Sequence, residues 1–307
     1  MAVVAYLACA LVWSTTWYAI RVCIGPGGYP TYGSAALRFT LAAAMLAIAT
    51  LAGWGRPLAS RRQARWVAVA GLLNAAGYAL VYRAEQDLSG GLAAVLYGVM
   101  PLITAVLATI TRTERARPST VAGALVGLAG IAVIFWDRLG VSSGQGLGVV
   151  LVLLSVTAAS SYSVILKRKA ADLHPVASTA IFFPVTAAAL WLLALALERQ
   201  APPWPPPFAP TMALVYLAVF GSVITFAAYF YLVSHVRLAT VATLVLVEPV
   251  LALVVDALFE HRVRLDPLAY VGAGITVGGV LTTVVFGAGR GPAQPAVLSG
   301  QPEPRGE

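Results

Sequence analysis

Residues 91–102 read GLAAVLYGVMPL, and residues 239–250 read ATVATLVLVEPV. A shift of 148 positions places Pro101 on Pro249 and aligns an alanine and a leucine ahead of each proline. Matching prolines inside matching apolar segments indicate that the chain is an internal duplication. The alternative is chance similarity between two segments rich in alanine, leucine and valine.

Two pairs of glycines continue the likeness beyond the prolines. A shift of 149 positions places Gly123 on Gly272 and Gly130 on Gly279. Each half contains five apolar spans, an odd number, so two similar halves would cross a bilayer in opposite directions. Inverted halves whose helices are interrupted by proline or glycine at matching positions are typical of secondary transporters with a binding site near the membrane midplane.

The composition is that of a membrane protein. Hydrophobic residues make up 60% of the chain, charged residues make up 10%, and the mean hydropathy is +0.85. Soluble domains carry about 25% charged residues. The net charge of +8 does not indicate a nucleic-acid partner, because the arginines lie mostly in short loops and form no basic stripe with interleaved aromatic residues.

Windows of about 20 apolar residues predict an all-α membrane protein with ten transmembrane helices. We expect these helices near residues 2–22, 31–52, 64–82, 89–111, 119–136, 146–166, 175–197, 211–234, 240–259 and 267–286. Residues 1–142 would form the first five-helix repeat and residues 143–286 the second, inverted repeat. Residues 287–307, rich in glycine, proline and charge, are expected to be a disordered cytoplasmic tail.

The loop charges predict the orientation. With the N-terminus inside the cell, thirteen loop arginines and lysines fall on the cytoplasmic side and five on the outer side. This bias follows the positive-inside rule. We therefore expect a multi-pass protein of the bacterial inner membrane with both termini in the cytoplasm.

Several short motifs carry a resemblance to a known family. They are Trp13 with Ser14 in the first span, ALRF at 36–39 in the second, and LVEPV at 246–250 in the ninth, together with the glycine-spaced fifth and tenth spans. With the ten-span layout, the chain resembles the drug/metabolite transporter superfamily, in particular its EamA-type exporters. Within that family it is most similar to the YddG-type exporters of aromatic amino acids, and the resemblance implies export of small metabolites.

One face of the third span is polar and aromatic. Asn74, Tyr78 and Tyr82 follow each other at intervals of four residues and so share a helix face. The 148-residue shift places Asn74 on Ser222 and Tyr78 on Phe226. Because lipid offers no partner to a buried amide or hydroxyl, this face is predicted to line a cavity. The alternatives are ordinary helix packing and an aromatic belt at the membrane interface.

Other candidate binding residues come from the first, fourth, sixth and eighth spans. Trp13 and Trp17 lie too deep for belt tryptophans, and Ser163 lies on the sixth span where the internal copy matches Trp17. Tyr97 and Tyr229 add phenolic hydroxyls. A tryptophan deep in the membrane needs a partner for its indole N–H, which a polar cavity supplies. Simple close helix contact is the alternative for Ser163.

Pro101 and Pro249 are predicted to break their helices. A proline inside a helix leaves the carbonyl four residues earlier without its usual hydrogen bond, here the carbonyls of Tyr97 and Val245. Such a break either exposes polar backbone to a ligand or allows the helix to bend.

Four ionisable residues lie inside the spans. Arg38 and Asp256 have similar depth and are interpreted as structural charges that pair with each other, with Arg21 as a second partner for Asp256. Glu248 lies deepest, and burial disfavours its charged form. We consider Glu248 either a proton-coupling site or a ligand for an amino group; the alternative is a structural clasp at the helix break.

Signatures of an enzyme are absent from the sequence. His174, His235 and His261 have no acidic or cysteine partners at metal-ligand spacing, and no phosphate-binding glycine loop or nucleophile elbow occurs. We therefore expect no catalytic residues, no metal and no cofactor. The expected partners are a small-molecule substrate and the lipid bilayer, and the sequence is compatible with a monomer.

These observations predict a secondary transporter that exports small metabolites, amino acids and in particular aromatic ones, by alternating access through a central aromatic-lined cavity. Aromatic walls also suit an organic cation through cation–π attraction. An exporter of lipophilic cationic drugs therefore remains an alternative. A passive facilitator or channel for small metabolites is another.

Overall fold

The structure of the chain is a computed structural model that describes residues 1–52, 60–84, 90–136, 145–198, 200–259 and 267–286. Throughout these ranges the chain forms helices joined by short connections, with no strand. The side chains of Trp17, Arg21 and Asp256 lie outside the described part, as does the expected tail at 287–307.

The helices follow one another along the chain with few residues between them. The first six are α1 (Ala2–Ile24), α2 (Thr31–Leu51), α3 (Arg61–Ala84), α4 (Gly90–Tyr97), α5 (Met100–Ile110) and α6 (Pro118–Ile134). The remainder are α7 (Gly146–Lys169), α8 (Pro175–Leu197), α9 (Phe208–Ala218), η2 (Val219–Ile224), α10 (Thr225–His235), α11 (Leu238–Ala242), α12 (Leu244–Phe259), α13 (Pro267–Leu281) and η3 (Thr282–Phe286), where η2 and η3 are π-helical.

The described helices confirm the all-helical membrane class. Seven of them are long and apolar enough to cross a membrane. Three further apolar helices are shorter than 18 residues in the described part of the chain: Val95–Ile110, Pro118–Ile134 and Leu238–Leu251. Each of these ten stretches overlaps one of the spans expected from the sequence.

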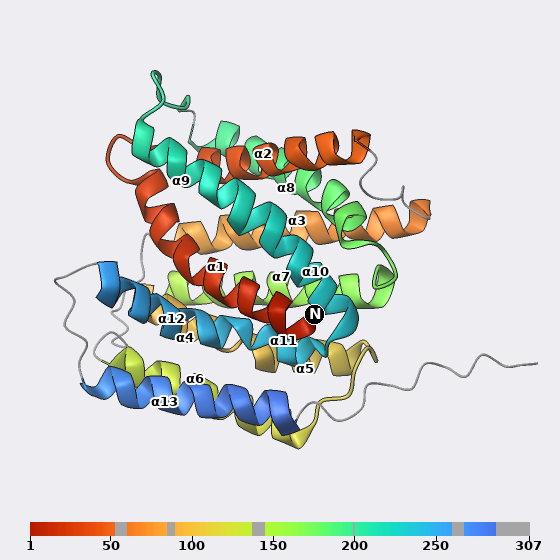
Figure 1. Cartoon of the computed structure of the whole chain (residues 1–307), viewed down its shortest axis with the longest axis vertical. Helices are drawn as coiled ribbons and strands as arrows, with labels where there is room; N and C mark the ends of the chain where they lie inside the picture. The colour runs from red at the N-terminus through yellow and green to blue at the C-terminus, as the bar shows by residue number, and fades with distance from the viewer. Residues whose placement is uncertain (53–59, 85–89, 137–144, 199, 260–266, 287–307) are drawn as a thin grey trace, which may run out of the picture.

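The helices form a stack, with α2 and α8 at one end and α6 and α13 at the other, and α1 and the α9–α10 segment cross the others obliquely (Figure 1). Between these two pairs, α3 packs against α7 and α8, while α1 packs against α9, α10 and α12. The α5 helix packs against α7. A helix of the first half thus repeatedly contacts a helix of the second half, so neither half forms a separate body.

The α6 and α13 helices meet through glycine. A Cβ atom on Gly130 would lie 2.7 Å from the carbonyl oxygen of Gly272, and a Cβ on Gly123 would lie 2.6 Å from that of Gly279. The backbones therefore approach as closely as they do only because these positions lack side chains. The contact is reciprocal: Gly123 faces the residue that aligns with Gly130, and Gly130 faces the residue that aligns with Gly123.

Two helices of the stack are interrupted at or near the positions of the matching prolines. The first interruption separates α4 from α5 directly before Pro101, where a proline break was predicted. The second interruption lies at Thr243, between α11 and α12, and Pro249 lies inside α12 instead of at the break. At Thr243 the hydroxyl donates to the carbonyl of Thr240 at 2.6 Å and lies 2.8 Å from the hydroxyl of Tyr6. A hydroxyl bonded in this way competes with regular helical bonding.

Candidate functional site

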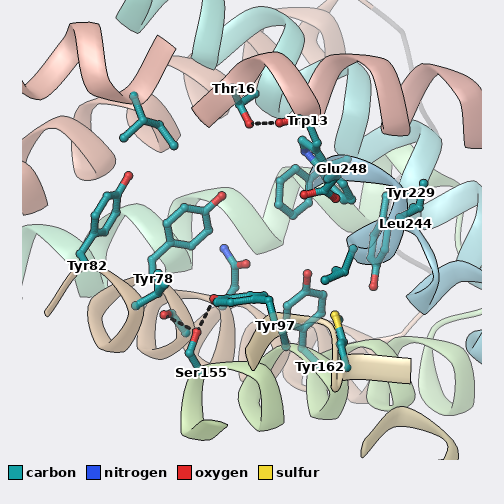
Figure 2. A pocket seen from close by; sticks show the side chains of 18 of the residues that line it. Trp13, Thr16, Tyr78, Tyr82, Tyr97, Ser155, Tyr162, Tyr229, Leu244 and Glu248 are labelled. Atoms are coloured by element: carbon teal, nitrogen blue, oxygen red, sulfur yellow. Dashed lines mark hydrogen bonds between the residues drawn. The ribbon is translucent and has the colours of Figure 1, made fainter. Parts of the chain in front are cut away.

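A cavity lies between α1 and the wall that α3 and α7 form (Figure 2). Its volume is about 170 Å³, less than the roughly 300–1,000 Å³ found for small-molecule sites. The lining residues are Trp13, Thr16, Ile20, Arg38, Asn74, Gly77, Tyr78, Val81, Tyr82, Tyr97, Met100, Ser155, Ala159, Tyr162, Phe226, Tyr229, Val241, Leu244, Val245 and Glu248.

Most of the binding residues expected from the sequence lie on this cavity. Those that line it are Trp13, Asn74, Tyr78, Tyr82, Tyr97, Phe226, Tyr229 and Glu248. They come from α1, α3, α4, α10 and α12, so helices from both halves of the chain build one site. Trp17 lies on α1 as well, but its side chain is outside the described part.

The tyrosine wall is held by hydrogen bonds. The hydroxyl of Ser155 donates to the carbonyl of Gly77 at 2.8 Å and therefore accepts from the Tyr97 hydroxyl, 2.7 Å away. These two hydrogen bonds link α4, α7 and α3 and fix the Tyr97 ring across the cavity (Figure 2). Tyr78 and Tyr82 extend the wall along α3, with ring centroids 6.0 Å apart.

An aromatic layer closes the cavity on the side of α8 and α10. The Trp13 ring lies 5.7 Å from Phe226 and 5.4 Å from Tyr229. Behind them, Phe182 and Phe183 are fully buried, and both contact Phe226 at 5.7 and 5.3 Å. Edge-to-face pairs at these distances contribute about 0.5–1.5 kcal/mol each beyond the burial of apolar area. The layer is therefore a packed barrier, whereas the tyrosine wall beside it leaves open space.

The two serines predicted to orient a substrate do not line the cavity. Ser163 donates to the carbonyl of Ala159 at 2.7 Å and so accepts from the Tyr229 hydroxyl at 2.6 Å. Ser222 donates to a backbone carbonyl of α9 at 3.1 Å and accepts from Arg38 Nε at 2.8 Å. Each serine therefore orients a residue that does line the cavity.

Arg38, interpreted from the sequence as a structural charge, is 2% exposed and lines the cavity. Its Nη2 donates to the carbonyl of Gly221 at 2.8 Å, and the centre of its guanidinium lies 5.4 Å from the Phe39 ring and 5.7 Å from the Tyr78 ring. The proposed partner Asp256 has its side chain outside the described residues. Arg38 thus combines structural hydrogen bonds with a place on the cavity wall.

The π-helical turn η2 presents the acceptor that Arg38 uses. The carbonyl of Gly221 accepts from Arg38 Nη2 and, at 3.4 Å, from Trp13 Nε1. A Cβ at Gly221 would lie 3.0 Å from the methyl of Thr16 and 3.1 Å from Arg38 Nη2, so glycine leaves room for both helices. Single π turns inside α-helices frequently occur at functional sites. Sequence reasoning missed this turn, and the Gly221–Ser222 pair inside an apolar span was its only signal.

Two charged side chains face the cavity among the described lining residues. Arg38 is the basic one, and Glu248, 9% exposed on α12, is the acidic one. Figure 2 shows Glu248 beside Trp13, across the open space from Tyr97. Within the described ranges, no group of three histidine, cysteine, aspartate or glutamate side chains is placed to hold a metal ion. The chemistry of the site is therefore binding by rings, hydroxyls and two opposite charges.

Several lining residues were not singled out from the sequence. Ser155, Ala159 and Tyr162 lie on one face of α7 at intervals of four and three residues, which is a helical signal. Thr16 aligns with Tyr162 when the first helix is overlaid on the sixth by a shift of 146 positions. Apolar members such as Leu244 carry no comparable signal, because apolar residues occupy most positions of these helices.

A cluster of polar contacts lies away from the cavity, near the C-terminal ends of α5 and α7 and the N-terminal end of α11. Both carboxylate oxygens of Glu114 accept from the backbone N–H of Leu238 at 3.1 Å. The same carboxylate lies 3.9 Å from Lys167 Nζ and 3.8 Å from Arg237 Nε. We call Glu114, Lys167, Arg237 and Leu238 the Glu114 clasp. It joins a loop of the first half of the chain to two helices of the second half.

Comparison with known proteins places this arrangement in a family. The model of the EamA-like transporter family matches residues 1–136 and 146–285. The chain is 30% identical to an uncharacterized inner membrane transporter, YedA, of Escherichia coli K12, over 95% of this chain and 93% of that protein. It is 29% identical to a probable terminal-alkyne amino-acid exporter of Streptantibioticus cattleyicolor, over 91% of this chain and 92% of that protein.

The fold also has a counterpart among solved structures. A crystal structure 21% identical in sequence superimposes with a TM-score of 0.76, covering 93% of this chain and 96% of the other. At this level of identity the likeness concerns the fold alone.

Proposed function

This chain belongs to the EamA-like transporter family of membrane transporters, which are not enzymes, and we propose that it exports small metabolites, primarily amino acids and in particular aromatic ones. The observation that carries the proposal is the cavity, in which tyrosine and tryptophan rings surround one basic and one acidic side chain. A zwitterion with an apolar side chain complements such a lining.

The proposed mechanism is alternating access between two inverted five-helix repeats, residues 1–142 and 143–286. The reciprocal packing of Gly123 and Gly130 against Gly279 and Gly272 supports it, because a pseudo-twofold axis exchanges equivalent residues at a shared contact. The wider pattern of helix packing agrees: α3 lies on α7 as α10 lies on α1, and α5 lies on α7 as α12 lies on α1. The aromatic layer would form the closed side of the cavity in this state.

The relatives support the substrate class and the location. One of them is named as a probable exporter of an amino acid, and another as an inner membrane transporter. We extend both to this chain, with the two termini in the cytoplasm, as the loop charges predict. The small-molecule substrate would then leave the cell through a site that both halves of the chain build.

A second candidate function is export of lipophilic cations. The rings of Trp13, Tyr78 and Tyr97 on the cavity favour it, because aromatic faces attract organic cations. Passive facilitation by a channel is a further alternative, since proton coupling in this proposal depends on Glu248 alone.

Uptake into proteoliposomes tests the proposal. The purified protein is assayed with radiolabelled phenylalanine, alanine and tetraphenylphosphonium, with and without a pH gradient and with unlabelled substrate loaded inside. We expect saturable phenylalanine flux that internal phenylalanine accelerates. Flux that neither saturates nor responds to internal substrate would indicate a channel, and flux of tetraphenylphosphonium alone would indicate the cationic-drug alternative.

A further inference from the structure

The guanidinium of Arg38 uses only part of its hydrogen-bonding capacity on the protein. An arginine side chain carries five N–H donors. Nε donates to Ser222 and Nη2 donates to the Gly221 carbonyl, both at 2.8 Å. Nη1 has no hydrogen-bond partner among the described residues, and Arg38 as a whole is 2% exposed. The residue lines the cavity, so the donors left over belong to its wall.

The charge of Arg38 is also not neutralised by the described part of the chain. The ion pairs there join Glu114 to Lys167 and Arg237, and none involves Arg38. The Phe39 and Tyr78 rings stabilise the cation by facing it at 5.4 and 5.7 Å. Neutral oxygens and rings compensate a buried charge only in part, whereas a carboxylate both neutralises it and accepts two parallel hydrogen bonds.

We propose that Arg38 is the carboxylate-binding residue of the cavity and that it restricts the substrates to small molecules bearing a carboxylate. The inference rests on the proposed function and names the substrate class of that same site. Ser222 and the π turn at Gly221 hold the guanidinium in a fixed plane, so that Nη1 faces the ligand. Tyr78 then lies beside both the guanidinium and the substrate side chain.

The same geometry selects against the cationic alternative. A lipophilic cation in the cavity would lie close to the guanidinium in a medium of low dielectric, where like charges repel far more strongly than in water. The aromatic walls attract a cation, but Arg38 opposes it from within the wall. With Glu248 as the acidic side chain on the same cavity, the rings and the two opposite charges together favour a zwitterion over a cation.

Ligand analogues test the proposal on the unaltered protein. Stabilisation of the purified protein against heat is measured with phenylalanine, with phenylalanine amide, which lacks the carboxylate, and with 3-phenylpropionate, which lacks the amine. We expect loss of the carboxylate to weaken binding about tenfold or more, the loss that a charge-assisted hydrogen bond implies. Equal binding of phenylalanine and its amide, or no stabilisation by either carboxylate, would overturn the proposal.

Two variants sharpen the test. Arg38→Gln should bring the affinities for phenylalanine and its amide together and should improve binding of tetraphenylphosphonium; Arg168→Gln, an exposed arginine of α7, should change neither. The ratio of two affinities does not depend on how much of a variant is folded, and the measurement on the unaltered protein stands if Arg38→Gln fails to fold. An unchanged ratio in folded Arg38→Gln contradicts the assignment.

Transport separates this inference from the proposed function. Carboxylate-selective binding without saturable flux in proteoliposomes would leave Arg38 as the anchor and refute export. Saturable flux of phenylalanine and its amide at equal efficiency would support a carrier and refute the role of Arg38.

Discussion

The cavity and the α6–α13 contact are opposite cases of helix packing: helices are held apart in the first and brought into backbone contact in the second. In the cavity, large rings from α1, α3 and α10 keep the helices apart and leave a volume of about 170 Å³. At the α6–α13 contact, glycines bring two backbones together so closely that an added methyl group would meet a carbonyl oxygen at 2.6–2.7 Å. The first region can accommodate a ligand and rearrange, whereas the second has no room for either.

This difference teaches where the chain tolerates change. A ring on the cavity can be removed at the expense of binding, because the neighbouring rings still fill the adjacent layer. A glycine at the α6–α13 contact has no neighbour that can give way, since the opposing atoms are backbone. Substitutions in the two regions should therefore separate stability from transport.

Gly279→Ala should have the largest effect. Its Cβ would lie 2.6 Å from the carbonyl oxygen of Gly123, so α13 must move away from α6. Overpacking of this kind costs about 1–3 kcal/mol, and we expect lower expression and a lower thermal midpoint in detergent. Gly278→Ala is the matched control on the next residue, where a Cβ meets nothing within 4 Å. Equal stability of the two variants would contradict the close contact.

Tyr78→Ala should impair transport with little loss of stability. The ring faces the cavity and lies 5.7 Å from the Arg38 guanidinium, so its removal takes away a stacking surface and loosens the anchor. We expect Tyr78→Ala to lose about 1.4 kcal/mol of binding free energy, which corresponds to a tenfold lower transport efficiency. The sequence predicts a similar effect for Trp17→Ala. Tyr270→Ala, on the exposed face of α13, is the control; undiminished flux in both Tyr78→Ala and Trp17→Ala would refute the aromatic site.

Glu248→Gln should remove the response of transport to a pH gradient while leaving the protein folded. Glu248 is the acidic side chain among the described lining residues, and glutamine keeps its shape but does not ionise between pH 5 and 8. The measurement is phenylalanine flux between pH 5 and 8 in proteoliposomes, with Asp172→Asn, an exposed carboxylate, as control. A pH profile identical to that of the unaltered protein would assign Glu248 a structural role.

Glu114→Gln should have the smallest effect. The ion pairs of the Glu114 clasp are 3.8 and 3.9 Å long and partly exposed, and such pairs contribute about 0.2–1 kcal/mol. Glutamine retains an oxygen that can accept from the Leu238 N–H. We therefore expect the rate of substrate counterflow to change by no more than about fivefold. Counterflow at two salt concentrations checks this, because screening should weaken the clasp of the unaltered protein and not that of the variant.

The sequence was sufficient to predict the helical membrane class and much of the cavity wall, because intervals of four residues fix which side chains share a helix face. Asn74, Tyr78 and Tyr82 were found in this way and do line the cavity. The duplication also paired Gly123 and Gly130 with their partners on α13, although which glycine faces which required the structure.

Other features could not be derived from spacing. Ser163 and Ser222 lie behind the wall because their hydroxyls are bonded to Tyr229 and Arg38, and helix periodicity does not distinguish a residue on the wall from one that supports it. The helix break at Thr243 depends on a hydroxyl that bonds within its own turn. Arg38 was assigned to structure alone because its donors on the cavity side become visible only when its other bonds are known.

The π turn at Gly221 is a structural difference between the two halves of the chain. It adds one residue to a turn between α9 and α10, whereas α3, at the corresponding place in the first half, is α-helical throughout. In a carrier built from related halves, identical halves would give inward-facing and outward-facing forms of equal free energy. In a carrier of the proposed kind, this difference between the halves would allow the inward-facing and outward-facing forms to differ in free energy, so that the empty protein would favour one of them.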